Sequence, residues 1–80
     1  MHYVYILLCK DNTLYTGMTN NIERRFLQHK NKKGAQYTKI HGAIKIVHKE
    51  KYQTKKEALK REEQIKGWRK GRKLKLIKFG

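Results

Sequence analysis

The sequence predicts an α/β fold of the α+β type, a small three-stranded antiparallel sheet flanked by helices in the order β-β-α-β-α. Two observations support this expectation. Segments rich in β-branched and aromatic residues alternate with segments of helical periodicity, and a short polar turn joins the first two strands. So short a connection makes those two strands antiparallel. The 80 residues suffice for one domain with a modest core, and we assign residues 1–80 to it.

The predicted strands are short. The first two span residues 2–9 and 13–19, and the turn signal Lys10-Asp11-Asn12 separates them. The third spans residues 43–49, where apolar and polar residues alternate as in a strand with one wetter face.

Helical segments follow the first two strands and the third. Asn20 is expected to be an N-cap, with Glu23 three positions later, before Ile22, Phe26 and His29 at helical spacing. This pattern predicts that the first helix turns one apolar stripe toward the sheet.

Further along the chain, residues 35–39 are expected to form a short helical turn. Thr54-Lys55-Lys56-Glu57 is a capping-box pattern that opens a helix reaching about Arg69. A last short helix is expected to pack Leu74 and Ile77 against the fold.

The charge balance of the chain restricts its partners. There are 21 Lys and Arg residues against 6 acidic ones, a formal net charge of +15. Self-repulsion at this density disfavours the compact state, which points to a polyanionic partner. The basic residues are spread along the whole chain, which favours nucleic acid over a membrane surface. We therefore predict DNA as the partner, with RNA as the alternative.

Two features indicate a cytoplasmic protein without a membrane role. The apolar run Val4–Cys9 is too short to span a bilayer and lacks a basic leader and a cleavage site. Cys9 is the single cysteine of the chain and cannot form an internal disulfide, which fits a reducing compartment.

The register of the first hairpin decides whether Tyr5 and Tyr15 can work together. A two-residue turn would place the two phenols on opposite faces of the sheet. A three-residue loop with Asn12 in the left-handed conformation places Gly17 opposite Tyr5, with both phenols on one face about 7–8 Å apart at Cα. Gly17 then leaves a gap where a phosphate could approach. The alternative reading is that both rings are ordinary core aromatics.

Three other residues carry chemistry on packing faces. Arg25 flanks the apolar stripe of the first helix beside His29, and Glu62 falls inside the stripe of the later helix, with Glu63 at its margin. A carboxylate on a packing face must be paired, metal-bound or neutralised. The alternatives are that Glu62 forms a structural salt bridge, with Arg25 as one candidate partner, and that His29 is a structural histidine.

Taken together, these residues resemble a known family. The order of Tyr5, then Tyr15-Thr16-Gly17, then Arg25 ten residues after Tyr15, then His29, and finally Glu62 is similar to the GIY-YIG nuclease superfamily. The likeness is greatest to its small, single-domain bacterial branch, and it covers roughly residues 2 to 78. It implies the family's three-stranded antiparallel sheet with flanking helices and an endonuclease site that depends on Mg²⁺ or Mn²⁺.

The resemblance also implies a role for each matching residue. Tyr5 is expected to activate the attacking water, and Tyr15 to help orient water or phosphate. Arg25 would hold the scissile phosphate and Glu62 the metal ion, while His29 occupies a position that is histidine in some members. Because a phenol with a pKa near 10 is a poor base at pH 7, we expect Arg25 and the metal to lower the pKa of Tyr5.

Several positions depart from the family's pattern. Tyr3 replaces the glycine of the first motif and Thr16 the isoleucine of the second, both at positions of backbone or packing. Met18 stands where some repair-type members have a functional lysine, and no asparagine follows Glu62 to match the one that some members use. These departures leave open the details of proton transfer, including whether Tyr5 or His29 is the base.

The remaining basic residues are expected to bind phosphates without reading sequence. The predicted contacts are Lys30, Lys32, Lys33, Arg69, Lys70, Arg72 and Lys73. Trp68, in the middle of the basic tail, either stacks on a base or packs in the core.

The function predicted from the sequence is a divalent-metal-dependent endonuclease acting on DNA phosphodiester bonds, on branched or damaged structures as in DNA repair. The main rival is a non-catalytic DNA- or RNA-binding module that keeps the same fold. A ribosome-associated basic protein would explain the charge but not the tyrosine, arginine and glutamate set. Nucleases of this superfamily usually borrow specificity from an appended domain, so a protein partner for targeting is a further expectation. The oligomeric state is not indicated.

Overall fold

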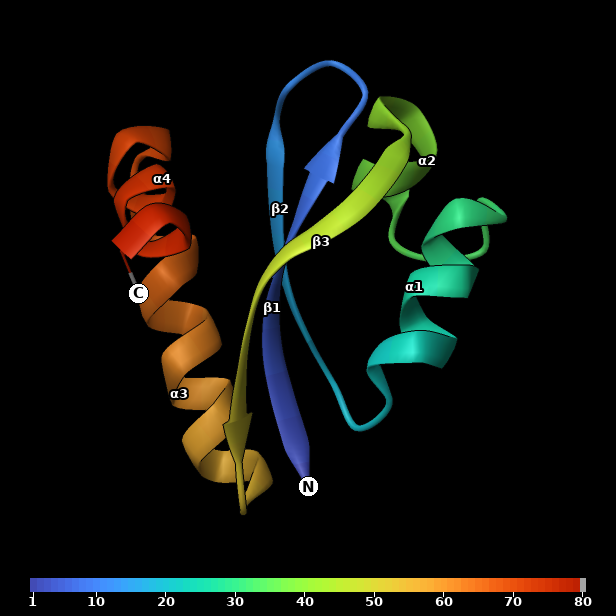
Figure 1. Ribbon diagram of the computed structural model, residues 1–80. Helices are drawn as coiled ribbons and strands as arrows, with labels where there is room; N and C mark the ends of the chain where they lie inside the picture. Colours follow the sequence, from blue (N-terminus) through green and yellow to red (C-terminus); the bar gives the residue numbers. More distant parts are fainter. Residues whose placement is uncertain (80) are drawn as a thin grey trace.

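The computed structural model describes residues 1–79, and Gly80, the last residue of the predicted domain range, lies outside them. The order of elements is β1 (His2–Cys9), β2 (Leu14–Thr19), α1 (Ile22–Lys30), α2 (Gln36–His41), β3 (Ala43–Tyr52), α3 (Lys55–Lys66) and α4 (Lys70–Phe79). The predicted three-stranded antiparallel sheet with flanking helices is confirmed (Figure 1).

The strand order in the sheet is β2-β1-β3, which makes β1 the central strand. β3 extends to Tyr52, beyond the predicted end at residue 49, because it pairs with the whole of β1 down to His2. The pairing shifts register between Ile6 and Leu7 and again between Leu8 and Cys9. Edge strand β3 therefore bends around the central strand.

The first hairpin has the three-residue loop that the shared-face prediction requires. Asn12 adopts φ 66°, and its N–H donates to the carbonyl of Cys9 at 3.0 Å. Tyr5 then lies opposite Gly17, and Leu7 lies opposite Tyr15. The register is confirmed, and both phenols project from the same face of the sheet.

Two helix boundaries differ from the prediction. The N-cap of α1 is Asn21 and not Asn20: its side-chain oxygen accepts the N–H of Arg24 at 3.0 Å, because the helix begins at Ile22. The helix opened by the Thr54 capping box ends at Lys66 instead of about Arg69, because Gly67 caps it and a separate helix begins at Lys70. Asn20 instead accepts from the guanidinium of Arg24.

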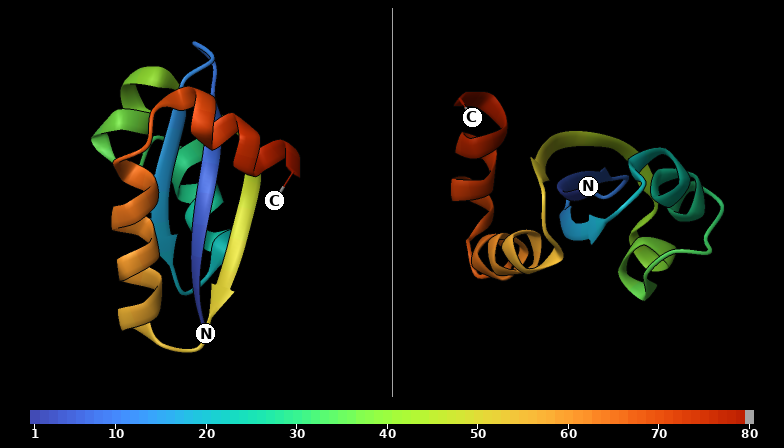
Figure 2. Two further views of the ribbon diagram at one scale, coloured as in Figure 1. Left: turned by 90° about the vertical axis from the view of Figure 1, so that its left-hand side faces the viewer. Right: turned by 90° about the horizontal axis from the view of Figure 1, so that it is seen from below.

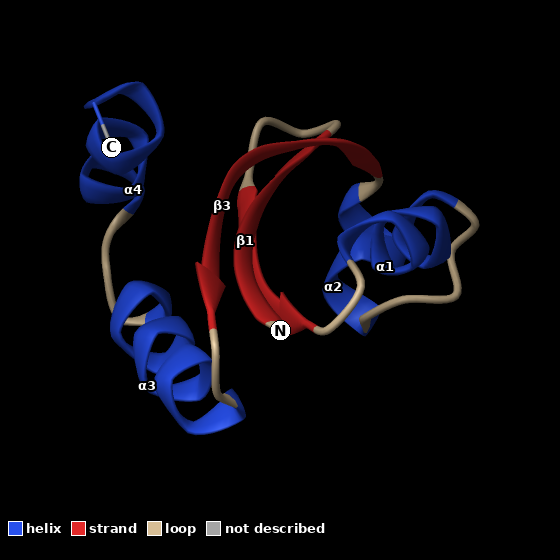
Figure 3. Cartoon of the chain, turned by 60° about the horizontal axis from the view of Figure 1, so that its bottom comes forward, coloured by secondary structure: helices blue, strands red, loops and turns tan. Residues whose placement is uncertain are grey.

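The helices cover the two faces of the sheet in pairs, α1 and α2 on one side and α3 and α4 on the other (Figure 3). α3 runs alongside the strands while α4 crosses them obliquely (Figure 2). Because side chains alternate along β1, Val4 and Ile6 pack toward Ala58 and Ile65 of α3. Tyr5 and its alternate neighbours point toward α1.

Trp68 packs against the core on the α3 side. This agrees with core packing, one of the two roles that the sequence predicted for it. The guanidinium groups of Arg61 and Arg72 lie over its ring, 5.1 Å and 4.2 Å from the centroid. Within residues 1–79, none of the helices has the length and apolar content that crossing a bilayer requires.

Candidate functional site

The centre of the candidate site is a hydrogen bond between a tyrosine and a histidine that are both 1% exposed. The hydroxyl of Tyr5, from β1, lies 2.8 Å from Nε2 of His29, from α1. Gly17 on β2 lies against this hydroxyl, and a methyl group there would overlap it. Glycine at position 17 is therefore required by the close approach of the Tyr5 side chain.

The second nitrogen of His29 settles which atom carries the proton. Its Nδ1 lies 2.7 Å from the hydroxyl of Thr38, and that hydroxyl donates to the carbonyl of Ala35 at 2.9 Å. Since the Thr38 proton is used there, Thr38 accepts from Nδ1–H, which leaves Nε2 as an acceptor. The Tyr5 O–H therefore donates to a neutral His29, and the proton of the pair resides on the phenol.

The electrostatics of the pair agree with this assignment. Burial raises the pKa of Tyr5 to about 12, although the neighbouring Arg25 acts to lower it. Burial lowers the pKa of His29 to about 4, and the charge of Arg25 adds to that effect. Arg25 therefore acts on the pKa of Tyr5 in the expected direction, but in the free protein the desolvation of the phenolate outweighs the attraction of the cation, and the net shift is upward.

Tyr15 lies in an aromatic cluster on the same face. Its ring centroid is 6.3 Å from that of Tyr5, 5.4 Å from that of His29 and 5.6 Å from that of Tyr37. Tyr37 in turn stacks on His41. Sequence reasoning missed Thr38 and Tyr37, and the one available signal was that both fall in the short polar helix α2.

Arg25 projects from α1 toward the two phenols. Its Nη1 donates to the side-chain oxygen of Gln28 at 3.1 Å, one turn further along the helix. The charge of Arg25 influences both Tyr5 and His29. The structure thus brings together four predicted residues, Tyr5, Tyr15, Arg25 and His29. The gap expected at Gly17 for a phosphate is filled by the Tyr5 side chain itself.

Glu62 enters from the other side of the sheet, on α3, which contacts β1 and β2. Its side chain is only 13% exposed, and its partner is the half-exposed Lys66, 3.4 Å away and one turn later. Burial, Arg25 and Tyr15 have the larger effects on the pKa of Tyr5, and the charge of Glu62 also raises it. The carboxylate therefore acts electrostatically on the phenol. Arg25 is not its ion-pair partner within the part of the chain that the structure describes.

The donor set around Glu62 fits a hydrated magnesium ion better than zinc. No three His, Cys, Asp or Glu residues gather at one point among residues 1–79. Mg²⁺ keeps several of its waters and binds to one or two carboxylates, whereas structural zinc requires four protein ligands. Glu62 is shielded from solvent and has one weak i,i+4 partner, so its oxygens retain capacity for such an ion.

Comparison with known proteins decides the family. Residues 1–75 match the model of the GIY-YIG catalytic domain.

The chain belongs to the GIY-YIG family.

Its relatives are small bacterial GIY-YIG proteins of the UPF0213 group. A UPF0213 protein of Staphylococcus saprophyticus is 51% identical over 79 residues, covering 99% of this chain and 96% of the relative. One from Clostridium perfringens is 51% identical over 77 residues, covering 96% and 83%. The solution NMR structure of the UPF0213 protein BH0048 from Bacillus halodurans is similar with a TM-score of 0.62 and 39% identity, covering 96% of this chain and 82% of that one. A GIY-YIG domain implies nuclease-type activity in general, and nucleases of this kind generally use divalent metals.

In this GIY-YIG chain, the predicted phosphate-binding lysines and arginines fall into two groups. Most are exposed, among them Lys32 and Lys33 just after α1. Lys30 and Lys70, by contrast, donate to the backbone carbonyls of Ala43 and Asn12, and burial lowers the pKa of Lys73. The first group is therefore freer than the second to meet a phosphate.

The GIY-YIG fold here also contains a hydrogen-bond network between β3 and α3 that sequence reasoning missed. Glu50 on β3 accepts from His48 at 2.9 Å, from Tyr52 at 2.7 Å and from Arg61 of α3 at 2.9 Å. Despite the opposing effect of burial, these donors lower the pKa of Glu50 to about 2. At 100° per residue, Arg61 and Glu62 lie on opposite sides of the buried stripe of α3. The ion pair of Arg61 with Glu50 therefore fixes the rotation of the helix and, with it, the direction in which Glu62 projects.

Acid should weaken the fold of this GIY-YIG domain through His29. Below pH 6.5 the unfolded chain binds a proton on His29, whereas the folded protein binds it only at about pH 4. The free energy of unfolding therefore decreases as the pH is lowered from 6.5 to 4. We expect the free energy of unfolding to drop by about 2 kcal/mol between pH 7 and pH 5. Urea denaturation at pH 7, 6 and 5 measures this.

A matched pair of variants isolates the contribution of His29. His29→Gln should be less stable at pH 7 but nearly flat between pH 7 and 5, while His2→Gln should keep the wild-type dependence. Glu50 and Asp11 hold pKa values lowered to about 2, so their contributions are lost only in more acidic solution. An unchanged slope in His29→Gln would contradict the neutral, buried state of this residue.

Proposed function

We propose that this protein is a divalent-metal-dependent endonuclease that hydrolyses DNA phosphodiester bonds. The observation that supports it most is the oriented chain from the Tyr5 hydroxyl through His29 to Thr38. A phenol whose proton is directed at an unprotonated imidazole nitrogen can pass that proton on when it takes one from water. A buried tyrosine hydroxyl needs a hydrogen-bond partner in any case, but an unprotonated imidazole is a partner that can also take up its proton.

In this mechanism each residue has one task. A water oxygen attacks the phosphorus as its proton passes to the Tyr5 oxygen, and the Tyr5 proton passes to Nε2 of His29. The bond from phosphorus to the leaving oxygen breaks, and that oxygen takes up a proton from solvent. Arg25 holds the scissile phosphate. Besides burial, the charge of Arg25 lowers the pKa of His29 in the free protein, and the negative charge of the bound phosphate would offset this effect of Arg25. Tyr15 orients the water or the phosphate. Glu62 would hold Mg²⁺ or Mn²⁺, whose chemistry there is to neutralise a non-bridging oxygen and assist the leaving group.

The net charge of +15 supports nucleic acid as the substrate, with DNA preferred and RNA the alternative. The exposed residues Lys32, Lys33, Arg69 and Arg72 would hold flanking phosphates. Lys30 and Lys70, which donate to backbone carbonyls, and the partly buried Lys73 would contribute less. Such contacts position a strand without reading its sequence. We place the activity in the cytoplasm on branched or damaged DNA, with a protein partner supplying the targeting.

One observation favours a second candidate, a DNA- or RNA-binding module without catalysis. Burial raises the pKa of Tyr5 to about 12, so the phenolate is scarce in the free protein at neutral pH. In that case the same cations would bind phosphates, and the Tyr5–His29 bond would only stabilise the fold.

A cleavage assay separates the two candidates. Purified protein is incubated with supercoiled, branched and single-stranded DNA in Mg²⁺ and, in parallel, in EDTA. We expect cleavage that requires Mg²⁺ and is absent in EDTA. Binding to DNA without cleavage of any of these substrates would favour the binding module instead.

A further inference from the structure

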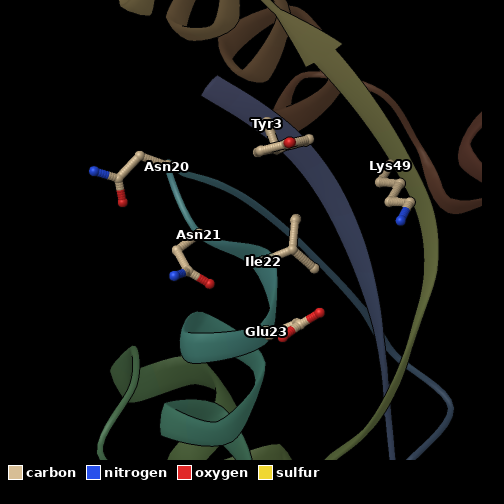
Figure 4. Close-up of a pocket in the computed structure, with 6 residues that line it drawn as sticks. All are labelled: Tyr3, Asn20, Asn21, Ile22, Glu23 and Lys49. Atoms are coloured by element: carbon tan, nitrogen blue, oxygen red, sulfur yellow. The ribbon is translucent and has the colours of Figure 1, made fainter. Parts of the chain in front are cut away.

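A hollow of 360 Å³ lies beside the candidate site, where β1 begins and the connection from β2 enters α1 (Figure 4). It is lined by Tyr3, Asn20, Asn21, Ile22, Glu23 and Lys49. Tyr3 lies two residues before Tyr5 on the same strand and therefore projects from the same face, about 7 Å away. The hollow is thus within a nucleotide or two of the Tyr5 hydroxyl along a bound strand.

The lining of this hollow combines apolar and charged surfaces. The Tyr3 ring and the Ile22 side chain lie one above the other, and Lys49 lies to one side of them (Figure 4). Glu23 contributes a carboxylate and Lys49 an ammonium group, and neither belongs to an ion pair within 4 Å among residues 1–79. An aromatic surface with one unpaired acceptor and one unpaired donor around it is the complement of a nucleobase.

The alternative, a simple phosphate site, fits this hollow poorly. The Glu23 carboxylate would repel a phosphate, whereas it can accept hydrogen bonds from the amino groups of bases. Lys49 can donate to the ring nitrogens and carbonyl oxygens of a base. The volume lies near the lower limit for small-ligand pockets, about 300 Å³, which suits a single base rather than a base pair.

We propose that this hollow holds one unpaired nucleobase of the strand whose phosphate lies at Tyr5, with Tyr3 as its stacking surface. The proposal rests on the proposed function, because it assumes a nucleic-acid strand in the cleft. Tyr3 stands at a position where the first motif of the resembling family has glycine, which would offer no ring for a base to stack on. Stacking on an aromatic ring tolerates any base, and Glu23 and Lys49 would add a preference among bases.

The test is a thermodynamic cycle between the Tyr3 ring and one base of the ligand. Single-stranded DNA oligonucleotides, intact or with one abasic position moved along the strand, are titrated in EDTA and followed by fluorescence anisotropy. For the wild type, we expect one abasic position to weaken binding about tenfold, equivalent to about 1.4 kcal/mol. Tyr3→Leu should weaken binding of the intact strand by a similar factor and lose its sensitivity to that abasic position, while Tyr3→Phe should behave like wild type.

A second pair of variants tests the rim without touching the ring. Lys49→Ala and Lys45→Ala remove equal charge from two exposed positions of β3, but only Lys49 lines the hollow, whereas Lys45 lies opposite Leu8. Lys45→Ala should weaken all strands by the same factor, whereas Lys49→Ala should also reduce the tenfold penalty of the abasic position. If Tyr3→Leu fails to fold, this pair still tests the proposal.

The outcomes separate this proposal from the nuclease activity. Equal sensitivity to the abasic position in wild type and Tyr3→Leu would overturn the base subsite, even if Mg²⁺-dependent cleavage persists. Coupling between Tyr3 and one base without any cleavage would support the subsite and remove the endonuclease. Failure of the wild type to bind any strand would overturn both.

Discussion

Glu62→Gln is expected to lower Mg²⁺-dependent cleavage by about 10³-fold, because a metal held by this carboxylate supplies several kcal/mol of charge stabilisation to the transition state. Binding of DNA should stay near normal or become slightly tighter, because a negative charge leaves the phosphate site. Stability should change little, because the partner of Glu62 is one partly exposed Lys66. Cleavage rates, affinity in EDTA and the unfolding midpoint are measured on the same preparation.

The matched control is Glu63→Gln, which removes the same charge from the next, exposed position of α3. Its cleavage rate should lie close to wild type. If Glu62 serves only as an ion-pair partner, Glu62→Gln should instead lose activity in proportion to unfolding. Full cleavage by folded Glu62→Gln protein would rule out the assignment of the metal to this residue.

Tyr5→Phe should reduce the cleavage rate by about 10²–10⁴-fold, the usual contribution of a positioned base. The ring and the hairpin are retained, but His29 loses the donor to its Nε2. We therefore expect a loss of stability of about 1–3 kcal/mol, the typical cost of a buried polar group left unpaired. Rates must be measured well below the unfolding midpoint, so that folded variant is compared with folded wild type.

Tyr52→Phe is the control for Tyr5→Phe, because it removes a tyrosine hydroxyl from the other face of the sheet, where Tyr52 packs on the α3 side and donates to Glu50. It should cost stability without a comparable fall in the rate of the folded protein. If Tyr5→Phe kept the wild-type rate, the base would have to be another group, and His29→Gln would become the decisive variant.

Short-range rules anticipated most of the geometry around the two phenols. Asparagine tolerates the left-handed conformation, so the identity of Asn12 selected the three-residue loop, and this loop set the register that places Tyr5 opposite Gly17. The Thr54 cap followed in the same way from a local hydrogen bond to Glu57. The N-cap of α1 was misplaced by one residue because Asn20 and Asn21 are equally good caps and nothing local distinguishes them.

The sequence by itself therefore determined the strands, the hairpin register and the presence of chemically suitable residues on packing faces, because alternation, turn conformation and capping depend on residues a few positions apart. Tertiary structure alone decided what those residues experience. His29 meets Thr38 from a different helix, and Glu50 meets Arg61 from α3, contacts that no local pattern encodes. The pKa of Tyr5 shows the same division: the sequence placed a cation near the phenol, but the burial created by packing of α1 on the sheet outweighs it and keeps the proton on the oxygen.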